Sequence, residues 1–267
     1  MISIQEEWVL SKEDHLDSIK NKPYYDCFLD TSRSKEYYSL IDFEAIHLEE
    51  MLHMHLAATH TVLLKYSPHQ YVYPWVDLQE DGQLKSLYSG QQLDPLKMIE
   101  DDLRQYKLLQ EGRFSGTEGL IYNCEHVVPQ SWFDGDEPMR GDLHHLFACE
   151  PSCNRMRSNF PFYDFESYAP EFTANVIRTG CGMAENQKFE PEYGKGVVAR
   201  AVFYFSLRYK GVISLKDRMD SRLLLKWHEA QPVTRYEKHR NAAIQELQGN
   251  RNPFIDFPEE AEKMLGM

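Results

Sequence analysis

The sequence has no long hydrophobic run and is short of basic residues. No window approaches the roughly 18 uninterrupted apolar residues of a membrane span, which excludes that class. Lys and Arg number 29 against 42 Asp and Glu, for a net charge of −13. This argues against a general affinity for nucleic acid, because phosphate binding needs basic groups. An acidic protein can still bind nucleic acid if its basic residues cluster at one cleft. Such a cluster could form from Arg113, Arg140, Arg155 and Arg157, which lie in one region of the sequence.

Cysteine is also scarce, and its number is odd. The five cysteines are Cys27, Cys124, Cys149, Cys153 and Cys181. Such a set does not resemble a disulfide framework. Cys149 and Cys153 are close enough to meet, so free thiols and one disulfide both stay open. Only one close pair is present, which argues against structural zinc.

The first residues lack the features of a secretory leader. Met1–Trp8 has neither a basic stretch nor an apolar stretch. We therefore expect a cytoplasmic protein, or a secreted one if a leader was removed.

The composition predicts a folded chain with a substantial core, because 42% of its residues are hydrophobic and 13% are aromatic. Apolar periodicity predicts helices, and alternation with turn residues predicts strands. Helices are expected over 38–65, 95–111, 196–210, 215–229 and 233–248, a short helix carrying Asn154 near 151, strands at 120–124 and 143–147, and a hairpin around Asp81-Gly82. Residues 1–37 are expected to form loop and short helix, and 160–194 an irregular excursion. The helix at 196–210 is apolar almost all round and should be buried.

Three polar runs carry the chemistry. They are Tyr122–Phe133, Arg140–Phe147 and Asn154–Asn159. Glu125 offers hard oxygen to a cation, and a neutral His126 can take a proton from water. Asn154 follows His126 by 28 residues and can add an amide oxygen. One carboxylate and one amide suit Mg²⁺, which keeps several waters and binds substrate phosphates.

Glu125 and His126 are neighbours, and neighbours on a regular strand point to opposite faces. Both can serve one site only where the strand ends, and Val127-Val128-Pro129 supplies such an end because Pro129 cannot continue a central ladder. Taken singly, the residues have ordinary explanations. A Glu-His pair is usually at the surface, and an Asn before Arg is usually a helix cap.

The histidines near residue 50 do not form a metal site. His47, His53, His55 and His60 are clustered, but no two have the spacing of three or four residues that a helical metal pair needs.

The order of the motifs resembles the endonuclease I family, within the ββα-metal (His-Me finger) superfamily. The resemblance rests on Tyr122-Asn123-x-Glu125-His126-Val127-Val128-Pro129, Asp142-Leu143-His144-x-Leu146, Asn154-x-x-Arg157-Ser158-Asn159, Gly196–Phe205, Trp227, Pro232-Val233-Thr234 and Gln248–Phe254, with a weaker likeness at Leu87–Gly90. It implies an α+β fold, with a ββα-metal core of short antiparallel strands surrounded by helices. Within a single nuclease domain (1–267), it implies a largely helical part over 1–110, the catalytic core over 113–160 and a helical part over 195–258.

The resemblance also implies the roles of the site residues. Glu125 and Asn154 match metal ligands and His126 matches the general base, with Arg140 first and Arg157 second as the arginine at the scissile phosphate. The cation is expected to be Mg²⁺, with Mn²⁺ or Ca²⁺ as alternatives.

The implied substrates are DNA and RNA, cut with little sequence specificity to leave 5′-phosphates. Two other functions stay open: a catalytically silent nucleic-acid-binding protein and a structure-selective nuclease. The family often has Asn where this chain has His145, which would brace the loop or approach the metal.

Overall fold

The computed structural model describes residues 4–111, 124–168, 180–213 and 218–267. Its elements are α1 (Ile4–Asn21), α2 (Cys27–Tyr37), α3 (Leu48–Thr59), α4 (Pro68–Tyr71), the π-helix η1 (Val72–Val76), β1 (Leu84–Lys85), β2 (Gln92–Leu93), α5 (Pro95–Gln110), β3 (Cys124–His126), the 3-10 helices η2 (Gln130–Trp132), η3 (Met139–Gly141) and η4 (Leu143–His145), β4 (Leu146–Ala148), α6 (Pro151–Arg157), β5 (Gly182–Glu185), β6 (Lys188–Pro191), α7 (Lys195–Arg208), α9 (Ser221–Ala230), α10 (Arg235–Gln248), α11 (Pro253–Asp256), η6 (Pro258–Glu260) and α12 (Ala261–Met264).

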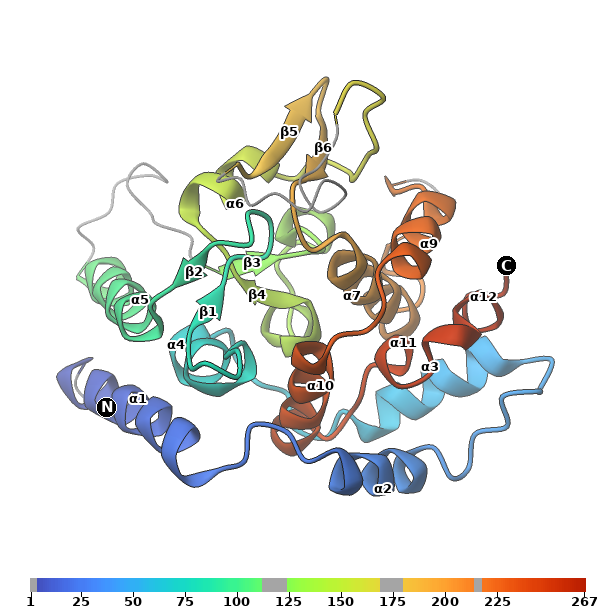
Figure 1. Cartoon of the computed structure of the whole chain (residues 1–267), viewed down its shortest axis with the longest axis horizontal. Coiled ribbons are helices and arrows are strands. Elements are labelled where there is room, and N and C mark those ends of the chain that lie inside the picture. Colours follow the sequence, from blue (N-terminus) through green and yellow to red (C-terminus); the bar gives the residue numbers. More distant parts are fainter. Residues whose placement is uncertain (1–3, 112–123, 169–179, 214–217) are drawn as a thin grey trace.

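Short strands lie among many helices, which confirms the predicted α+β class. The strands pair as β1–β2, β3–β4 and β5–β6, each an antiparallel pair (Figure 1). The β3–β4 pair lies near the centre, between α1, α4 and α5 on one side and α7 and α9 on the other. Among the described residues, no helix is both long enough and apolar enough to cross a membrane.

Helix α7 forms the middle of the larger hydrophobic cluster. Val198, Phe203 and Phe205 on α7 are fully buried, and the helix packs against α3 and α9. The prediction of a buried helix here is therefore confirmed. The other two C-terminal helices are also present as α9 and α10. Helix α9 starts later than predicted, at Ser221, because the Asp220 side chain accepts hydrogen bonds from the first free backbone amides.

The predicted helix over 38–65 is wrong in extent. Only Leu48–Thr59 is helical as α3, and the preceding turns leave Leu40 and Ile46 exposed by 86% and 95%. Their apolar periodicity did not reflect burial. Residues 1–37, predicted as loop and short helix, instead contain α1 and α2. Helix α2 starts because the Asp26 side chain caps its first turn.

The predicted hairpin around Asp81-Gly82 is also wrong. Residues 79–83 do form a tight turn, with Gly82 at a φ of +76°. However, the chain before that turn is the π-helix η1, not a strand. The actual hairpin lies further on, where Leu84 pairs with Leu93.

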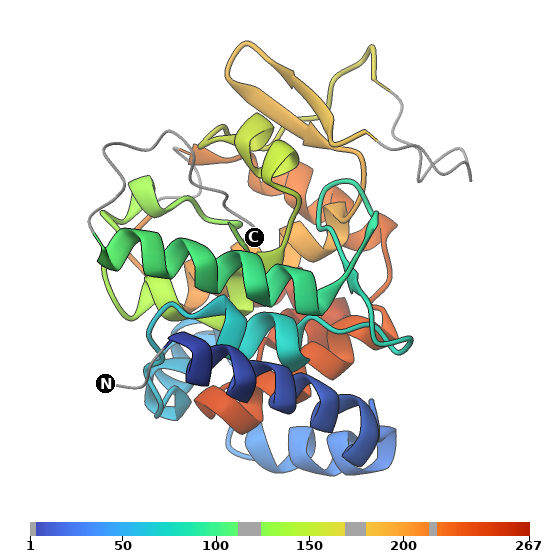
Figure 2. The same ribbon diagram turned by 90° about the vertical axis from the view of Figure 1, so that its left-hand side faces the viewer.

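The strands and helix around the catalytic motif are close to prediction. Helices α5 and α6 occupy the expected positions. The second strand starts later than predicted, at Leu146, because the Asp142 side chain caps η4 over the preceding three residues. Of the strand predicted at 120–124, only Cys124 lies within the described residues. The excursion over 160–194 contains a regular β5–β6 hairpin, which projects from the body in Figure 2.

The N-terminal helix α1 is fixed to the body by a buried histidine. Helices α1 and α5 lie side by side in Figures 1 and 2. Between them, His69 Nδ1 is 2.6 Å from Asp102 Oδ2 on α5, and its Nε2 is 2.9 Å from Glu7 Oε1 on α1. Burial alone would lower the pKa of His69, but these two carboxylates outweigh it and raise the pKa above the ordinary 6.5.

We expect this contact to weaken at alkaline pH. Because the folded-state pKa is raised, the stabilisation by His69 is complete below pH 6.5 and is lost as the pH rises through the folded-state pKa. The free energy of unfolding should fall by about 1 kcal/mol over that range. Urea unfolding at pH 6 and pH 9 would measure it, with His69→Gln expected to flatten the dependence and the exposed His47→Gln to keep it. If the free energy of unfolding changed equally with pH in all three proteins, His69 would not be the group responsible.

Candidate active site

Two strands and a helix bring the motif residues together. In the β3–β4 pair, Glu125 lies opposite Phe147 and His126 opposite Leu146. Helix α6 lies against β3, since Asn154 Nδ2 donates to the Cys124 carbonyl at 3.1 Å. Strand β3 ends at His126, as the sequence required. The structure thus joins the carboxylate, the imidazole and the carboxamide to one short strand.

Glu125 is a buried carboxylate with two partners on the same oxygen. Its Oε1 accepts a hydrogen bond from the Tyr88 hydroxyl at 2.6 Å and lies 3.3 Å from Arg157 Nη1. Burial raises the pKa of Glu125 to about 7, although Arg157 and the Tyr88 hydrogen bond act to lower it. Burial therefore outweighs the two partners in setting the pKa of this carboxylate.

His126 is held in one tautomer by the backbone. Its Nε2 donates to the Arg140 carbonyl at 3.0 Å, which leaves Nδ1 as the acceptor nitrogen. Gln130 Nε2 approaches that Nδ1 at 3.3 Å. Burial, and then the neighbouring His145, hold the pKa of His126 well below its usual range. The imidazole is thus neutral at pH 7 and presents Nδ1 as a proton acceptor.

The two candidate arginines lie in different surroundings. Arg140 is exposed, and its guanidinium lies 5.3 Å from the Tyr66 ring centre. Arg157 is only 1% exposed, and its Nη2 donates to the Val127 carbonyl at 2.7 Å. In this arrangement Arg157 links the end of α6 to the end of β3 and to Glu125. Its role at a phosphate stays a prediction, second to that of Arg140.

His145 braces the loop before the second strand. Its Nε2 donates to the Met139 carbonyl in η3 at 2.6 Å, and its ring centre is 5.3 Å from that of His126. Of the two roles that the sequence left open, the structure shows the bracing one. Met139 is followed in η3 by Arg140, whose carbonyl orients His126. His145 therefore supports the position of His126 indirectly.

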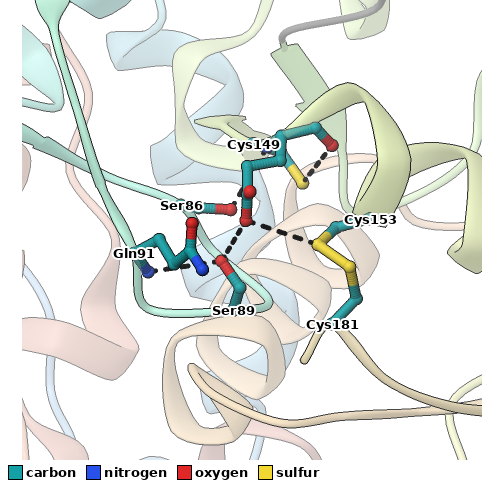
Figure 3. The surroundings of a disulfide bond; sticks show 7 residues. Ser86, Ser89, Gln91, Cys149, Cys153 and Cys181 are labelled. Atoms are coloured by element: carbon teal, nitrogen blue, oxygen red, sulfur yellow. Dashed lines mark hydrogen bonds between the residues drawn. A yellow bond between two sulfur atoms is a disulfide. The ribbon is translucent and has the colours of Figure 1, made fainter. Parts of the chain in front are cut away.

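One disulfide lies beside the site, and it is not the nearest pair in the sequence. Cys153 on α6 is bonded to Cys181, with Cα atoms 5.0 Å apart, whereas Cys149 is a buried free thiol (Figure 3). Cys149 precedes α6 and its thiol donates to the Glu150 carbonyl. The disulfide joins the helix that carries Asn154 to the chain leading into β5.

Sequence reasoning missed three side chains around the site. Tyr88, Tyr66 and Gln130 contact Glu125 or His126, with the Tyr66 and His126 ring centres 5.0 Å apart. Gln130 lies within the first motif, and Tyr88 within the weaker likeness at Leu87–Gly90, so both had a signal. Tyr66 had none. Tyr122, Asn123 and Arg113 lie outside the described residues.

No group of three or more His, Cys, Asp or Glu side chains in the described ranges has the arrangement of a metal centre. The expectation that the histidines near residue 50 do not bind metal stays a prediction. His53 instead contacts the Leu207 carbonyl at 2.9 Å.

Comparison with known families decides the assignment of the chain. The profile of the endonuclease I family, described as Endonuclease I, matches residues 47–259. The chain belongs to this family. Helices α1 and α2 precede the matched region. The matched region contains β3, β4 and α6, in agreement with the resemblance inferred from the motifs.

Several curated relatives of this endonuclease I family member are nucleases. An extracellular ribonuclease of Bacillus amyloliquefaciens is 34% identical over 161 residues, 54% of this chain and 53% of the relative. An extracellular deoxyribonuclease of Aeromonas hydrophila is 32% identical over 155 residues, 49% and 64% of the two chains. An Endonuclease-1 of Buchnera aphidicola is 34% identical over 118 residues, 43% and 45%. The matches span about half the length of these relatives.

These relatives overturn the expectation of a cytoplasmic protein. Two are named extracellular, and a further one, from Aeromonas hydrophila, is a periplasmic deoxyribonuclease. The expectation rested only on the first eight residues, which carry no information about the compartment in which the relatives act.

Proposed function

We propose that this protein is an endonuclease that hydrolyses phosphodiester bonds of DNA and RNA with little sequence specificity. Hydrolysis would depend on one divalent cation and leave 5′-phosphates. The observation that carries the proposal is the orientation of His126, whose Nε2 is fixed on the Arg140 carbonyl while Glu125 and Asn154 lie on the same strand and its neighbouring helix. Family membership and the nuclease relatives support it.

The side chains present fit a hard divalent cation. Glu125 is buried, and burial raises its pKa to about 7, so a cation beside it would stabilise the carboxylate. Glu125 and Asn154 would hold the ion, and their oxygen donors favour Mg²⁺, with Mn²⁺ or Ca²⁺ as alternatives. When bound, the ion would stabilise negative charge on the scissile phosphate and on the leaving oxygen.

The chain's own residues would then perform the proton transfer. His126 Nδ1 would accept a proton from water, whose oxygen bonds to phosphorus while the bond from phosphorus to the 3′-oxygen breaks. The 3′-oxygen would leave with the bonding electron pair and take a proton from solvent. The Arg140 carbonyl keeps the opposite nitrogen protonated, and the exposed Arg140 guanidinium can meet the phosphate charge. Because water is the nucleophile, no 2′-hydroxyl is needed, and both DNA and RNA can be substrates.

The compartment follows from the relatives and from the disulfide. We infer an oxidising compartment outside the cytoplasm, where the Cys153–Cys181 bond would persist.

The test is digestion of plasmid DNA and of RNA with Mg²⁺, Mn²⁺ or Ca²⁺ and then with excess chelator. We expect nicking of plasmid and fragmentation of RNA with metal, both stopped by chelator, and product ends that a phosphatase can dephosphorylate at the 5′ side. Binding without cleavage in every metal would favour the silent alternative, and cleavage of branched DNA alone would favour the structure-selective one.

The Tyr88 hydroxyl should set the metal affinity of this site. Tyr88→Phe keeps the buried ring but frees Glu125 Oε1 from its short hydrogen bond. Loss of a bond that orients a metal ligand typically weakens metal binding about 10- to 100-fold. We therefore expect the Mg²⁺ concentration for half-maximal cleavage to rise by at least about tenfold.

Tyr73→Phe is the matched control for that titration. Tyr73 is equally buried, but its hydroxyl has no hydrogen-bond partner within the described residues. This variant should therefore keep the wild-type Mg²⁺ dependence. If the two variants behaved alike, Tyr88 would not orient Glu125.

A further inference from the structure

A large groove lies beside the candidate active site. Its volume is about 1180 Å³, and it is bounded by the end of α7, the start of α9, β6 and α12. Its floor is apolar, with Phe162, Leu225 and Met264 among the lining residues. Helices α7, α9 and α12 lie together on the right of Figure 1.

One side of the groove carries cations without carboxylate partners. Lys188 and Arg222 line it, and neither has an ion-pair partner among the residues that the structure describes. Arg218 also lines it and has no such partner there. In contrast, Lys210 in the same groove is neutralised by Glu49 and Glu50, at 3.1 and 2.8 Å. Two other acids also line the groove: Asp220, whose side chain caps the start of α9, and Glu262 within α12.

These cations are combined with aromatic rings. Lys188 Nζ lies 3.8 Å from the Tyr163 ring centre, and the Arg218 guanidinium lies 5.4 Å from the Trp132 ring centre. Tyr163 is 38% exposed, so part of its ring is open to a ligand. Aromatic faces beside unpaired cations are the two components of surfaces that bind single-stranded nucleic acid without reading its sequence.

The groove is joined to the candidate active site at two places. Trp132, under Arg218, is the last residue of η2, whose first residue Gln130 contacts His126 Nδ1. Phe162 on the groove floor lies 4.9 Å from the Arg157 guanidinium, which pairs with Glu125. The second contact is buried and offers no path for a strand, so the contact through η2 is the one that relates the groove to His126.

We propose that this groove binds a single-stranded stretch of the nucleic-acid substrate adjoining the scissile phosphate, with phosphates on Lys188, Arg218 and Arg222 and bases on Tyr163 and Trp132. The proposal rests on the proposed nuclease function for its choice of ligand. It explains how a chain with a net charge of −13 would hold a polyanion, because the attraction is confined to one groove. Separated bases can stack on the rings, whereas paired bases in a duplex cannot.

The test compares two double variants with the same charge change. Lys188→Gln with Arg222→Gln removes groove cations, whereas Lys35→Gln with Lys238→Gln removes two exposed cations from α2 and α10, which do not line the groove. Affinity for a fluorescent single-stranded 20-mer would be measured by anisotropy in chelator, over a series of salt concentrations. The groove variant should bind about tenfold more weakly in 0.1 M salt, with a salt slope smaller by about 1.4, the value for two lost phosphate contacts.

A second variant tests the stacking. Tyr163→Leu should weaken binding of the single strand by about tenfold but change duplex binding by less than about twofold. In metal, both groove variants should lower kcat/KM on the 20-mer and leave a tetranucleotide unaffected. Equal losses of affinity in the groove and control variants, or an unchanged salt slope, would contradict the proposal that the groove binds nucleic acid.

The anisotropy arm separates this proposal from the nuclease proposal, because it needs no catalysis. If the wild-type protein bound the 20-mer through the groove but cut no substrate with any metal, only the nuclease proposal would be contradicted. If every groove variant cut long and short substrates as fast as wild type, only the groove proposal would be contradicted.

Discussion

Replacing His126 with alanine is expected to slow cleavage of plasmid DNA by a factor of about 10² to 10⁴, the usual contribution of a general base. The variant loses the Nδ1 acceptor, while the strand, its β4 partner and the Asn154 contact to the Cys124 carbonyl do not depend on the imidazole. The measurement is the initial rate of supercoiled plasmid loss at saturating Mg²⁺. Nucleic-acid binding should stay close to that of wild type.

His47→Ala is the matched control for this experiment, because His47 is exposed at the start of α3. It should cut at the wild-type rate. The thermal midpoint of both variants should be measured beside the rates, so that loss of activity is not confused with loss of fold. A His126→Ala protein that is folded and cuts as fast as wild type would remove His126 from the reaction.

The second large effect is on stability, at Asp142. This carboxylate is fully buried and accepts four hydrogen bonds. Its donors are the hydroxyls of Tyr204 and Tyr209, at 2.8 Å each, and Gln248 Nε2 and the His144 amide, at 3.0 Å each. Asp142→Ala would leave these donors buried without an acceptor. We expect the free energy of unfolding to fall by about 3–5 kcal/mol.

Equilibrium unfolding in urea measures this loss, with Asp136→Ala as the control. Asp136 is exposed in the same loop, and its replacement should change the unfolding free energy by less than about 0.5 kcal/mol. Asp142 directly follows η3, which holds the Arg140 carbonyl against His126. Asp142→Ala should therefore also lower activity under conditions where it stays folded. A loss of under about 1 kcal/mol would show that the four bonds do not act as a buried network.

Local chemistry made much of this fold predictable. Helix α7 is apolar almost all round and was therefore expected to be buried, and Pro151 indicated the start of α6 because proline is favoured in a first turn. The end of β3 followed from Pro129. Where the prediction was wrong, burial was the missing information: Leu40 and Ile46 fit a helical period, yet they face solvent.

The sequence by itself identified the candidate groups Glu125, His126 and Asn154, their order, and the family to which they point. Those identities and spacings are covalent facts. Only the tertiary structure decided how the groups are held, because the partners come from distant segments. Tyr88 meets Glu125 from 37 residues away, and Cys181 bonds to Cys153 across 28 residues. The Arg140 carbonyl selects the tautomer of His126, and packing buries Arg157 beside Glu125. No local pattern encodes such contacts, since each depends on how the whole chain closes around β3.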